Sequence, residues 1–188
     1  MAHSGSSAVL RAADESSWAQ IVEGSVLPFT VDVPRAETFA GSIRASQLFD
    51  VGLFTMTCQR HAAARSRAEI RATAREEVVL TLQRTGRMRL RQHGRQTTLQ
   101  PGEFLLFTSA DPVQLEGSDD YSALGVRIPV SRFRTAGTQL QEITARSFSA
   151  DQGLGRSGLD TGGPAPARRR PDRGSQCGFG LPSSGGAG

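Results

Sequence analysis

The segment GRMRLRQHGRQTTLQPGEFLLF, residues 86–107, constrains the fold more than any other part of the chain. Apolar and polar residues alternate on both sides of His93-Gly94, and Pro101-Gly102 precedes a short apolar run. Such period-two alternation is typical of a strand that buries one face. Gly94 can take the positive φ that a tight hairpin turn requires. The segment therefore predicts an antiparallel hairpin followed by a buried strand.

Runs of the same kind occur along most of the chain, separated by turns that contain Gly or Pro. One further strand, near Ala68–Thr73, is expected inside an otherwise irregular link. Eight or more short strands at regular spacing favour a small antiparallel β-barrel or sandwich, so the predicted fold class is mainly β. The other strands are expected at residues 28–33, 39–45, 48–58, 77–85, 113–117 and 121–130.

Two short helical segments are expected beside the strands. In the first, residues 17–24, Ser17 and Gln20 have the spacing of a capping box and Gly24 is a typical stop. The second, about residues 131–148, begins at Ser131 and carries apolar residues among polar ones. That pattern indicates one or two helices that pack on the barrel.

The composition divides the chain into three parts. We expect a disordered arm at residues 1–14, the folded domain at 15–148 and a disordered tail at 149–188. The last 38 residues contain 11 Gly and 4 Pro without periodicity, so they cannot bury enough apolar surface to offset chain entropy. Because Arg, Gly, Pro and Ala have GC-rich codons, two explanations are open. The tail is either the product of a GC-rich gene read out of frame from near Gly153 or a naturally disordered segment.

Charge and cysteine content exclude several classes of protein. The net charge is +4 and every basic residue is Arg, yet 17 Arg and 15 acidic residues nearly balance in residues 1–150. This is not the charge excess of a polyanion-binding protein. Two cysteines make no disulfide framework and fit a reducing compartment. With neither a signal-peptide pattern nor 18 consecutive apolar residues, we expect a cytoplasmic protein that does not enter a membrane.

Metal ligands are scarce in the sequence. The chain has three histidines, His3, His61 and His93, and no two have the spacing of a chelating pair. Cys58 and His61 supply two ligands where a structural zinc needs four. We therefore expect no metal site, and a buried cysteine beside a histidine at a strand end.

Other motifs give no catalytic or nucleotide-binding site. The glycines of Gly153–Gly158 match a dinucleotide fingerprint but lack the strand before it and the helix after it. The basic run at residues 167–173 has no interleaved aromatic residues, and a solvated tail explains it better than nucleic-acid binding. Glu76 and Glu77 are neighbours, which point to opposite faces of a strand and cannot work as a pair. The sequence predicts no catalytic residue and no cofactor, and therefore no enzyme.

The arginines of the ribbon allow two interpretations. Arg87, Arg89 and Arg91 share one face of the predicted strand, with Met88 and Leu90 on the other. Inside a barrel the three arginines would bind an anionic effector, but three unpaired buried charges are too costly. The favoured interpretation places Met88 and Leu90 inside and the arginines in solvent.

The ribbon and its flanks resemble the AraC-type transcriptional regulators, in the cupin-like sensor domain that precedes their DNA-binding half. The resemblance covers roughly residues 15–147 and depends on the ordered run "LQ", Gly, "Q-x-G-R", "L-x-P-G-D/E" and an apolar strand. The residues that match are Leu82, Gln83, Gly86, Gln92, Gly94, Arg95, Leu99, Pro101, Gly102 and Glu103. These motif positions are expected to serve turns and strands.

Two departures from the family pattern matter. The usual "D-S-x-R-P-Y" after the apolar strand is replaced by Thr108–Val113, which puts the role of the missing residues in doubt. Nothing after Asp151 shows the apolar helical periodicity of a helix-turn-helix unit.

The resemblance implies an effector-sensing and dimerisation domain, truncated before its DNA-binding half. It implies a small-molecule effector and a homodimer as partners, and no specific DNA binding by this chain. Two alternatives stay open: a stand-alone, metal-independent cupin-like enzyme, and a truncated partner that pairs with full-length regulators. The sequence does not identify the ligand-binding residues, because a one-residue error in strand register inverts the faces.

Overall fold

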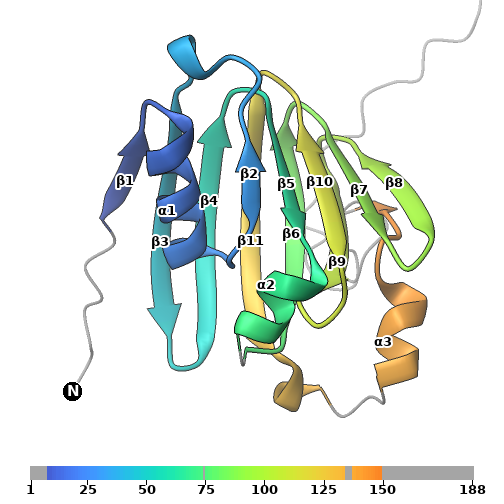
Figure 1. Ribbon diagram of the computed structural model, residues 1–188. Coiled ribbons are helices and arrows are strands. Elements are labelled where there is room, and N and C mark those ends of the chain that lie inside the picture. The colour runs from blue at the N-terminus through green and yellow to red at the C-terminus, as the bar shows by residue number, and fades with distance from the viewer. Residues whose placement is uncertain (1–7, 74, 134–136, 150–188) are drawn as a thin grey trace, which may run out of the picture. The chain divides into compact units, whose positions relative to one another are not determined.

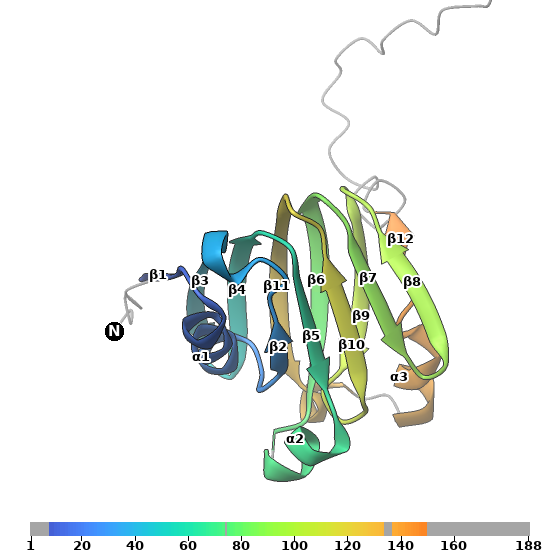
Figure 2. The same cartoon turned by 45° about the horizontal axis from the view of Figure 1, so that its top comes forward.

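Two antiparallel sheets lie face to face in the computed structural model, which describes residues 8–73, 75–133 and 137–149 (Figures 1 and 2). In spatial order, the larger sheet consists of β1 (Val9–Ala12), β3 (Gly41–Leu48), β4 (Val51–Cys58), β11 (Tyr121–Pro129), β6 (Glu77–Thr85), β9 (Glu103–Thr108) and β12 (Phe148–Ser149). The smaller sheet consists of β2 (Thr30–Asp32), β5 (His61–Arg65), β10 (Val113–Gly117), β7 (Met88–Gln92) and β8 (Arg95–Leu99). The helical elements are α1 (Glu15–Ser25), η1 (Ala36–Thr38), α2 (Arg67–Ala72), η2 (Val130–Arg132) and α3 (Gly137–Ile143). The mainly β fold class, with short flanking helices, is confirmed.

The ribbon forms the expected hairpin. β7 pairs with β8 in a register that sets Met88 opposite Leu99 and Gln92 opposite Arg95. The turn residues His93 and Gly94 have φ angles of 52° and 71°, as a two-residue hairpin turn requires. Met88 and Leu90 are buried, whereas the arginines between and beside them are exposed. The interpretation with the arginines in solvent is therefore confirmed.

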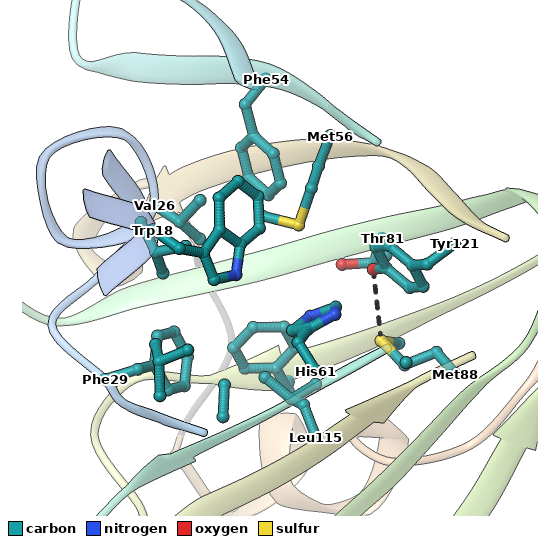
Figure 3. A pocket seen from close by; sticks show the side chains of 15 residues that line it. Trp18, Val26, Phe29, Phe54, Met56, His61, Thr81, Met88, Leu115 and Tyr121 are labelled. Atoms are coloured by element: carbon teal, nitrogen blue, oxygen red, sulfur yellow. Dashed lines mark hydrogen bonds between the residues drawn. The ribbon is translucent and has the colours of Figure 1, made fainter. Parts of the chain in front are cut away.

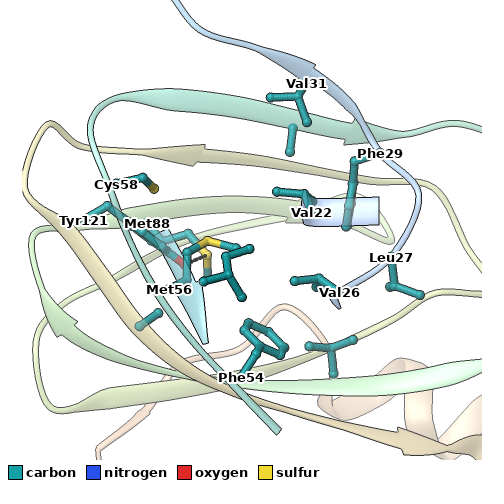
Figure 4. Packing of buried hydrophobic residues seen from close by; sticks show 14 of the residues in the cluster. Val22, Val26, Leu27, Phe29, Val31, Phe54, Met56, Cys58, Met88 and Tyr121 are labelled. Atoms are coloured by element: carbon teal, nitrogen blue, oxygen red, sulfur yellow. Dashed lines mark hydrogen bonds between the residues drawn. The ribbon is translucent and has the colours of Figure 1, made fainter. Parts of the chain in front are cut away.

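The core lies between the sheets and is closed on one side by α1. Figure 2 shows α1 alongside β2, in the space that the smaller sheet leaves open in front of β3 and β4. The helix packs against β1, β2 and β3, and Trp18 on its inner face is fully buried. Figure 4 shows Val22, Val26 and Phe29 of this region packed with Phe54 and the methionines of the strands. The helix thus completes the wall of the interior.

β11 is the central strand of the larger sheet. It lies between β4 and β6 and pairs with both in antiparallel register. Its neighbours come from residues 51–58 and 77–85, so the sheet joins segments that are far apart in the sequence.

The expected disordered arm at residues 1–14 is too long. Val9–Ala12 forms β1, which pairs with β3 in a register that sets Leu10 opposite Ile43. The sequence VLRA is too short to show periodicity, and the open edge of β3 decides its conformation. The first seven residues lie outside the described residues, as does nearly all of the expected tail, including Gly153–Gly158 and residues 167–173.

The limits of α1 differ from the prediction. Asp14, not Ser17, is the N-cap, because its side chain accepts a hydrogen bond from Ser17 N at 2.9 Å. The helix therefore begins one turn earlier, at Glu15. It also continues past Gly24 to Ser25 and ends where Val26 N donates to Val22 O.

The link before β6 contains a strand and a helix that the sequence did not predict. His61–Arg65 is β5, and Arg67–Ala72 is the helix α2, so the expected strand at Ala68–Thr73 is wrong. Ser66 and Glu69 form a capping box, and the side-chain hydrogen bonds from Ser66 and Thr30 lower the pKa of Glu69 to about 2. No described residue of α2 is buried, so its capping hydrogen bonds stabilise it. Without a buried apolar face, the helix has no apolar periodicity by which the sequence could predict it.

Two further expectations are corrected in detail. The run at residues 48–58 is not one strand, because Phe49, with φ 56°, turns the chain between β3 and β4. The expected helical segment 131–148 contains the 3₁₀ turn η2, which lacks a side-chain cap, and the shorter helix α3. Its last residue belongs to β12, which pairs with β9 and stacks Phe148 on Phe104. None of the described helices is long and apolar enough to cross a membrane.

Candidate functional site

A partly enclosed cavity lies between the two sheets, next to α1 (Figure 3). Its lining is mostly apolar and includes Val26, Phe29, Phe54, Met56 and Met88. They come from α1 and its link to β2, and from the inner faces of β4 and β7. The cavity volume is about 40 Å³, room for roughly one to three water molecules. An enclosed apolar cavity with a few polar groups is the usual form of a small-molecule site.

Trp18 and His61 are polar residues of this lining, which also includes Thr81 and Tyr121. The rings of Trp18 and His61 lie edge to face, with centroids 6.0 Å apart and planes at 82°. Trp18 is fully buried, and its Nε1 donor has no hydrogen-bond partner within the described part of the chain. Figure 3 shows this nitrogen directed toward the space beside His61. A buried donor without a partner is costly, and such groups often mark a site where a partner binds.

The contacts of His61 Nδ1 determine which ring nitrogen is left as an acceptor. Nδ1 lies 3.2 Å from Gln59 O and 3.3 Å from Cys58 Sγ. A carbonyl oxygen only accepts, so Nδ1 carries the proton and Nε2 keeps a free lone pair. Burial lowers the pKa of His61, so the ring is neutral at physiological pH.

Cys58 and Tyr121 lie beside His61, but neither side chain is ionised. Burial raises the pKa of the Cys58 thiol and that of the Tyr121 hydroxyl, so both keep their protons. Tyr121 OH donates to Met88 Sδ at 3.6 Å. A protonated thiol is neither a good nucleophile nor a metal ligand. The structure brings Cys58 and His61 together as the sequence suggested, and the described residues hold no cluster of three metal-binding side chains.

Acidification is expected to destabilise the protein through His61. The unfolded chain binds a proton at His61 as the pH falls below about 6.5, but the folded chain resists because burial lowers this pKa. Stability is therefore fully present above that value and falls with decreasing pH, by at most about 1.4 kcal/mol per pH unit, until the folded pKa is passed. Urea unfolding at pH 7.5 and 5.5 measures the loss. His61→Phe should remove much of it; a pH dependence in this variant equal to that of the parent protein would contradict the assignment.

Two buried arginines hold the link between α1 and β2 at one end of the cavity. Arg127 of β11 donates from Nη1 to Val26 O at 2.9 Å, and Arg65 of β5 donates from Nη1 to Pro28 O at 2.9 Å. Glu77 lies 3.6 Å from Arg127 and is equally buried. Both sheets thus hold the segment whose residues Val26 and Phe29 line the cavity.

The motif residue Gln92 ties the two sheets together at the end of β7. Its Nε2 donates to Thr108 O at 2.8 Å and to Asp111 O at 3.2 Å, and its Oε1 accepts from Thr108 N at 3.0 Å. Thr108 ends β9 of the larger sheet. The glutamine therefore links backbone groups of the larger sheet to a strand of the smaller one.

The motif residue Arg95 and the turn beside it hold the end of α3 and the link that leads to β12. Arg95 Nε donates to Thr144 O at 3.1 Å, and its Nη2 donates to Gln141 O. His93 bridges Thr144 Oγ1 and Asp111, each at 2.8 Å. Thr144 is fully buried. The "Q-x-G-R" run thus forms the hairpin turn and also holds residues 141–145 against it.

The remaining motif residues shape turns. Gly86 and Gly102 have φ angles of 67° and 83°, and a Cβ on Gly86 would lie 2.4 Å from Ser118 Oγ. Pro101 lies in the turn with Gly102, whose N donates to the backbone of Gln83 at 2.9 Å. Glu103 accepts from Gln100 N at 2.8 Å. None of these motif residues lines the cavity.

The sequence did not identify the cavity residues. Phe54 and Met56 follow period-two alternation, which marks them as inward-facing once the register is known. Trp18 falls within the helical segment expected at residues 17–24, but no local pattern shows that its indole N–H faces toward His61. That juxtaposition depends on the packing of α1 against β5.

The outer face of the smaller sheet is hollowed but open to solvent. Two of its arginines already have partners: Arg89 pairs with Glu116 at 2.9 Å and Arg60 with Asp119 at 3.5 Å. Both pairs are about half exposed, so they contribute little to stability. The cavity between the sheets is therefore the stronger candidate site.

Comparison with known proteins identifies the fold and the family. The AraC-binding-like domain matches residues 18–162. The transcriptional activator NphR of Rhodococcus sp. is 32% identical over 108 residues, which are 56% of this chain and 32% of that protein. An uncharacterized protein in nit 5'region of Bacillus sp. (strain OxB-1) is 24% identical over 108 residues, 57% of this chain and 42% of the relative.

A solved structure supports the same assignment. The crystal structure of the AraC-like transcriptional activator CuxR superposes with a TM-score of 0.60 and 19% identity, covering 67% of this chain and 48% of that one. At this identity the likeness shows a shared fold. The matched regions span less than half of each of these three proteins. Since the domain match covers most of the chain, the chain belongs to the AraC-binding-like domain family.

Proposed function

We propose that this chain is the effector-sensing domain of an AraC-type transcription regulator, and that its effector binds in the cavity beside Trp18 and His61. Family membership and the names of the relatives NphR and CuxR, both transcriptional activators, support a regulatory role. The observation that carries the proposal is the partly enclosed, mainly apolar cavity toward which the unpartnered Trp18 donor is directed (Figure 3). Such a lining binds a small molecule by burial and orients it by a few hydrogen bonds.

The hairpin β7–β8 is the proposed route from the cavity to the rest of a regulator. Met88, at one end of β7, lines the cavity. Gln92 and Arg95, at the other end of the hairpin, bind Thr108 and the backbone of residues 141–144. A ligand that displaces Met88 would shift the hairpin and the segment attached to it.

The proposal assigns no catalysis to the chain. Within the described residues, the cavity region brings together a neutral histidine, a protonated cysteine and a tyrosine that keeps its proton. This set lacks the paired carboxylates or the activated nucleophile of a hydrolytic site. A regulatory binding domain accounts for the cavity better than a metal-independent cupin-like enzyme does.

Self-association and DNA binding are the remaining parts of the proposal. We expect the chain to form a homodimer, or to pair with a longer relative, and not to bind an operator specifically. The edge strand β1 supports pairing, because among the described strands only β3 pairs with it and the other side of its backbone is left open. Sedimentation velocity of the full chain measures the first expectation, and a gel shift at raised salt measures the second.

Filling the cavity should abolish effector binding. Ala63 of β5 is buried and lines the cavity, whereas Ala62 beside it faces the outer surface of the same sheet. We expect Ala63→Met to eliminate the thermal stabilisation that small-molecule ligands give the full chain, because the longer side chain occupies their space. Ala62→Met is the matched control and should keep at least about nine-tenths of that stabilisation.

The measurement is the ligand-induced change in Tm, taken for each variant against its own unliganded Tm. This reference removes the cost of overpacking, which reaches roughly 1–3 kcal/mol in a filled core. Ligands that stabilise Ala63→Met as strongly as the parent protein would place the effector site elsewhere.

A further inference from the structure

The polar groups of the cavity restrict the chemistry of its ligand. The indole Nε1 of Trp18 can only donate a hydrogen bond. The Nε2 of His61 can only accept one, because Gln59 O fixes the proton on Nδ1. The two rings lie edge to face with centroids 6.0 Å apart. A ligand atom that reaches both nitrogens therefore has to accept from Trp18 and donate to His61.

We propose, on the basis of the function proposed above, that the cavity selects an uncharged, mainly apolar molecule carrying one hydroxyl group. The hydroxyl oxygen accepts from Trp18 Nε1, and its hydrogen is donated to His61 Nε2. A hydroxyl both accepts and donates at one oxygen. A carbonyl or a carboxylate oxygen only accepts, so it would place its own lone pair against the lone pair of His61 Nε2. The apolar remainder of the molecule lies against Phe29, Phe54 and the methionines.

The lining also excludes a charged ligand. Among the described residues that form it, none is an arginine or a carboxylate, and His61 is neutral because burial lowers its pKa. The nearby Arg65 and Arg127 donate to the backbone of Pro28, Ser109 and Val26. An anion in this cavity would lose its hydration without gaining a counterion.

The cavity must enlarge to hold more than a few atoms. Its present volume of about 40 Å³ is smaller than a substituted ring. Met56 and Met88 line it, and methionine side chains have three rotatable bonds and adapt to the shape of a neighbour. These two side chains are the ones that would move.

Three probes with the same ring separate the possibilities: benzyl alcohol, toluene and benzoate. Trp18 is the only tryptophan of the chain, so ¹⁵N-labelled full-length protein gives one indole N–H signal. We expect benzyl alcohol to move this signal downfield, as a new hydrogen bond does, and to bind about tenfold more tightly than toluene. Two neutral hydrogen bonds are worth roughly that factor or more. Benzoate should not shift the signal at the same concentrations.

Two variants test the hydrogen-bonding pair directly. In both Trp18→Phe and His61→Phe, with affinity measured by thermal shift, the preference should reverse so that toluene binds at least as tightly as benzyl alcohol. If either variant fails to fold, the binding of the three probes to the wild-type protein still tests the proposal.

The outcomes separate the two proposals. If toluene binds wild-type protein as tightly as benzyl alcohol, the cavity is a ligand site without the hydroxyl selectivity inferred here. Binding of benzoate at the indole overturns the exclusion of charge. If none of the three probes shifts the indole signal, this inference fails, and the proposed effector site loses its support as well.

Discussion

Replacing Gln92 with methionine is expected to lower the free energy of unfolding by about 3 kcal/mol. The glutamine side chain is 3% exposed and serves three backbone groups: the N–H and C=O of Thr108 and the C=O of Asp111. Methionine has nearly the same volume, so the variant opens no large cavity. It leaves buried donors and acceptors without partners, and each costs roughly 1–3 kcal/mol.

Urea denaturation followed by Trp18 fluorescence measures this loss, since the single tryptophan is buried in the core. The matched control is Gln114→Met on β10, where the side chain is exposed on the outer face of the smaller sheet. We expect the control to change stability by less than about 0.5 kcal/mol. Similar losses in the two variants would show that Gln92 does not link the sheets energetically.

Removing Glu77 alone should destabilise the fold by about 3–5 kcal/mol, because the change leaves Arg127 buried without its counterion. The side chains of Glu77 and Arg127 are 6% and 8% exposed and lie 3.6 Å apart. The proposed single variant is Glu77→Leu. The double variant Glu77→Leu, Arg127→Met replaces both charges with apolar groups and should recover roughly 2 kcal/mol of the loss.

A surface ion pair provides the control for that cycle. Arg132 donates to both carboxylate oxygens of Asp50 at 2.7 and 2.9 Å, but the two side chains are 61% and 42% exposed. Asp50→Ala should therefore cost less than about 1 kcal/mol. If the double variant is as unstable as Glu77→Leu, the hydrogen bond from Arg127 to Val26 O, not the charge pair, is the stabilising contact.

Sequence periodicity predicted the strands whose side chains alternate, and failed where they do not. Met88 and Leu90 alternate with arginines, so β7 and its buried face were predicted correctly. β5 reads HAAAR, and alanine favours helix, so only pairing with β2 and β10 makes it a strand. The helix α2 buries no described residue, so its capping residues are the only local sequence signal for it.

The candidate site was less predictable than the fold. Trp18 comes from α1, His61 from β5 and Met88 from β7, and no local pattern in the sequence relates these three elements. The motif residues were recognisable by resemblance, but their contacts with Thr108 and Thr144 depend on the tertiary fold. Hydrogen-bond partners that are distant in sequence are invisible to periodicity.

The position of β11 limits when the domain can fold during synthesis. The strand ends at Pro129 and separates β4 from β6, so a nascent chain that lacks it has two half-sheets, each with an unpaired edge. Pairings between segments so far apart in sequence form slowly, and open edges invite association with other chains. A ribosome must therefore release the chain through Pro129 before the larger sheet can close. Until then, the apolar inner faces of the strands that precede β11 are exposed, and only molecular chaperones or rapid synthesis of the remaining residues protect them from association.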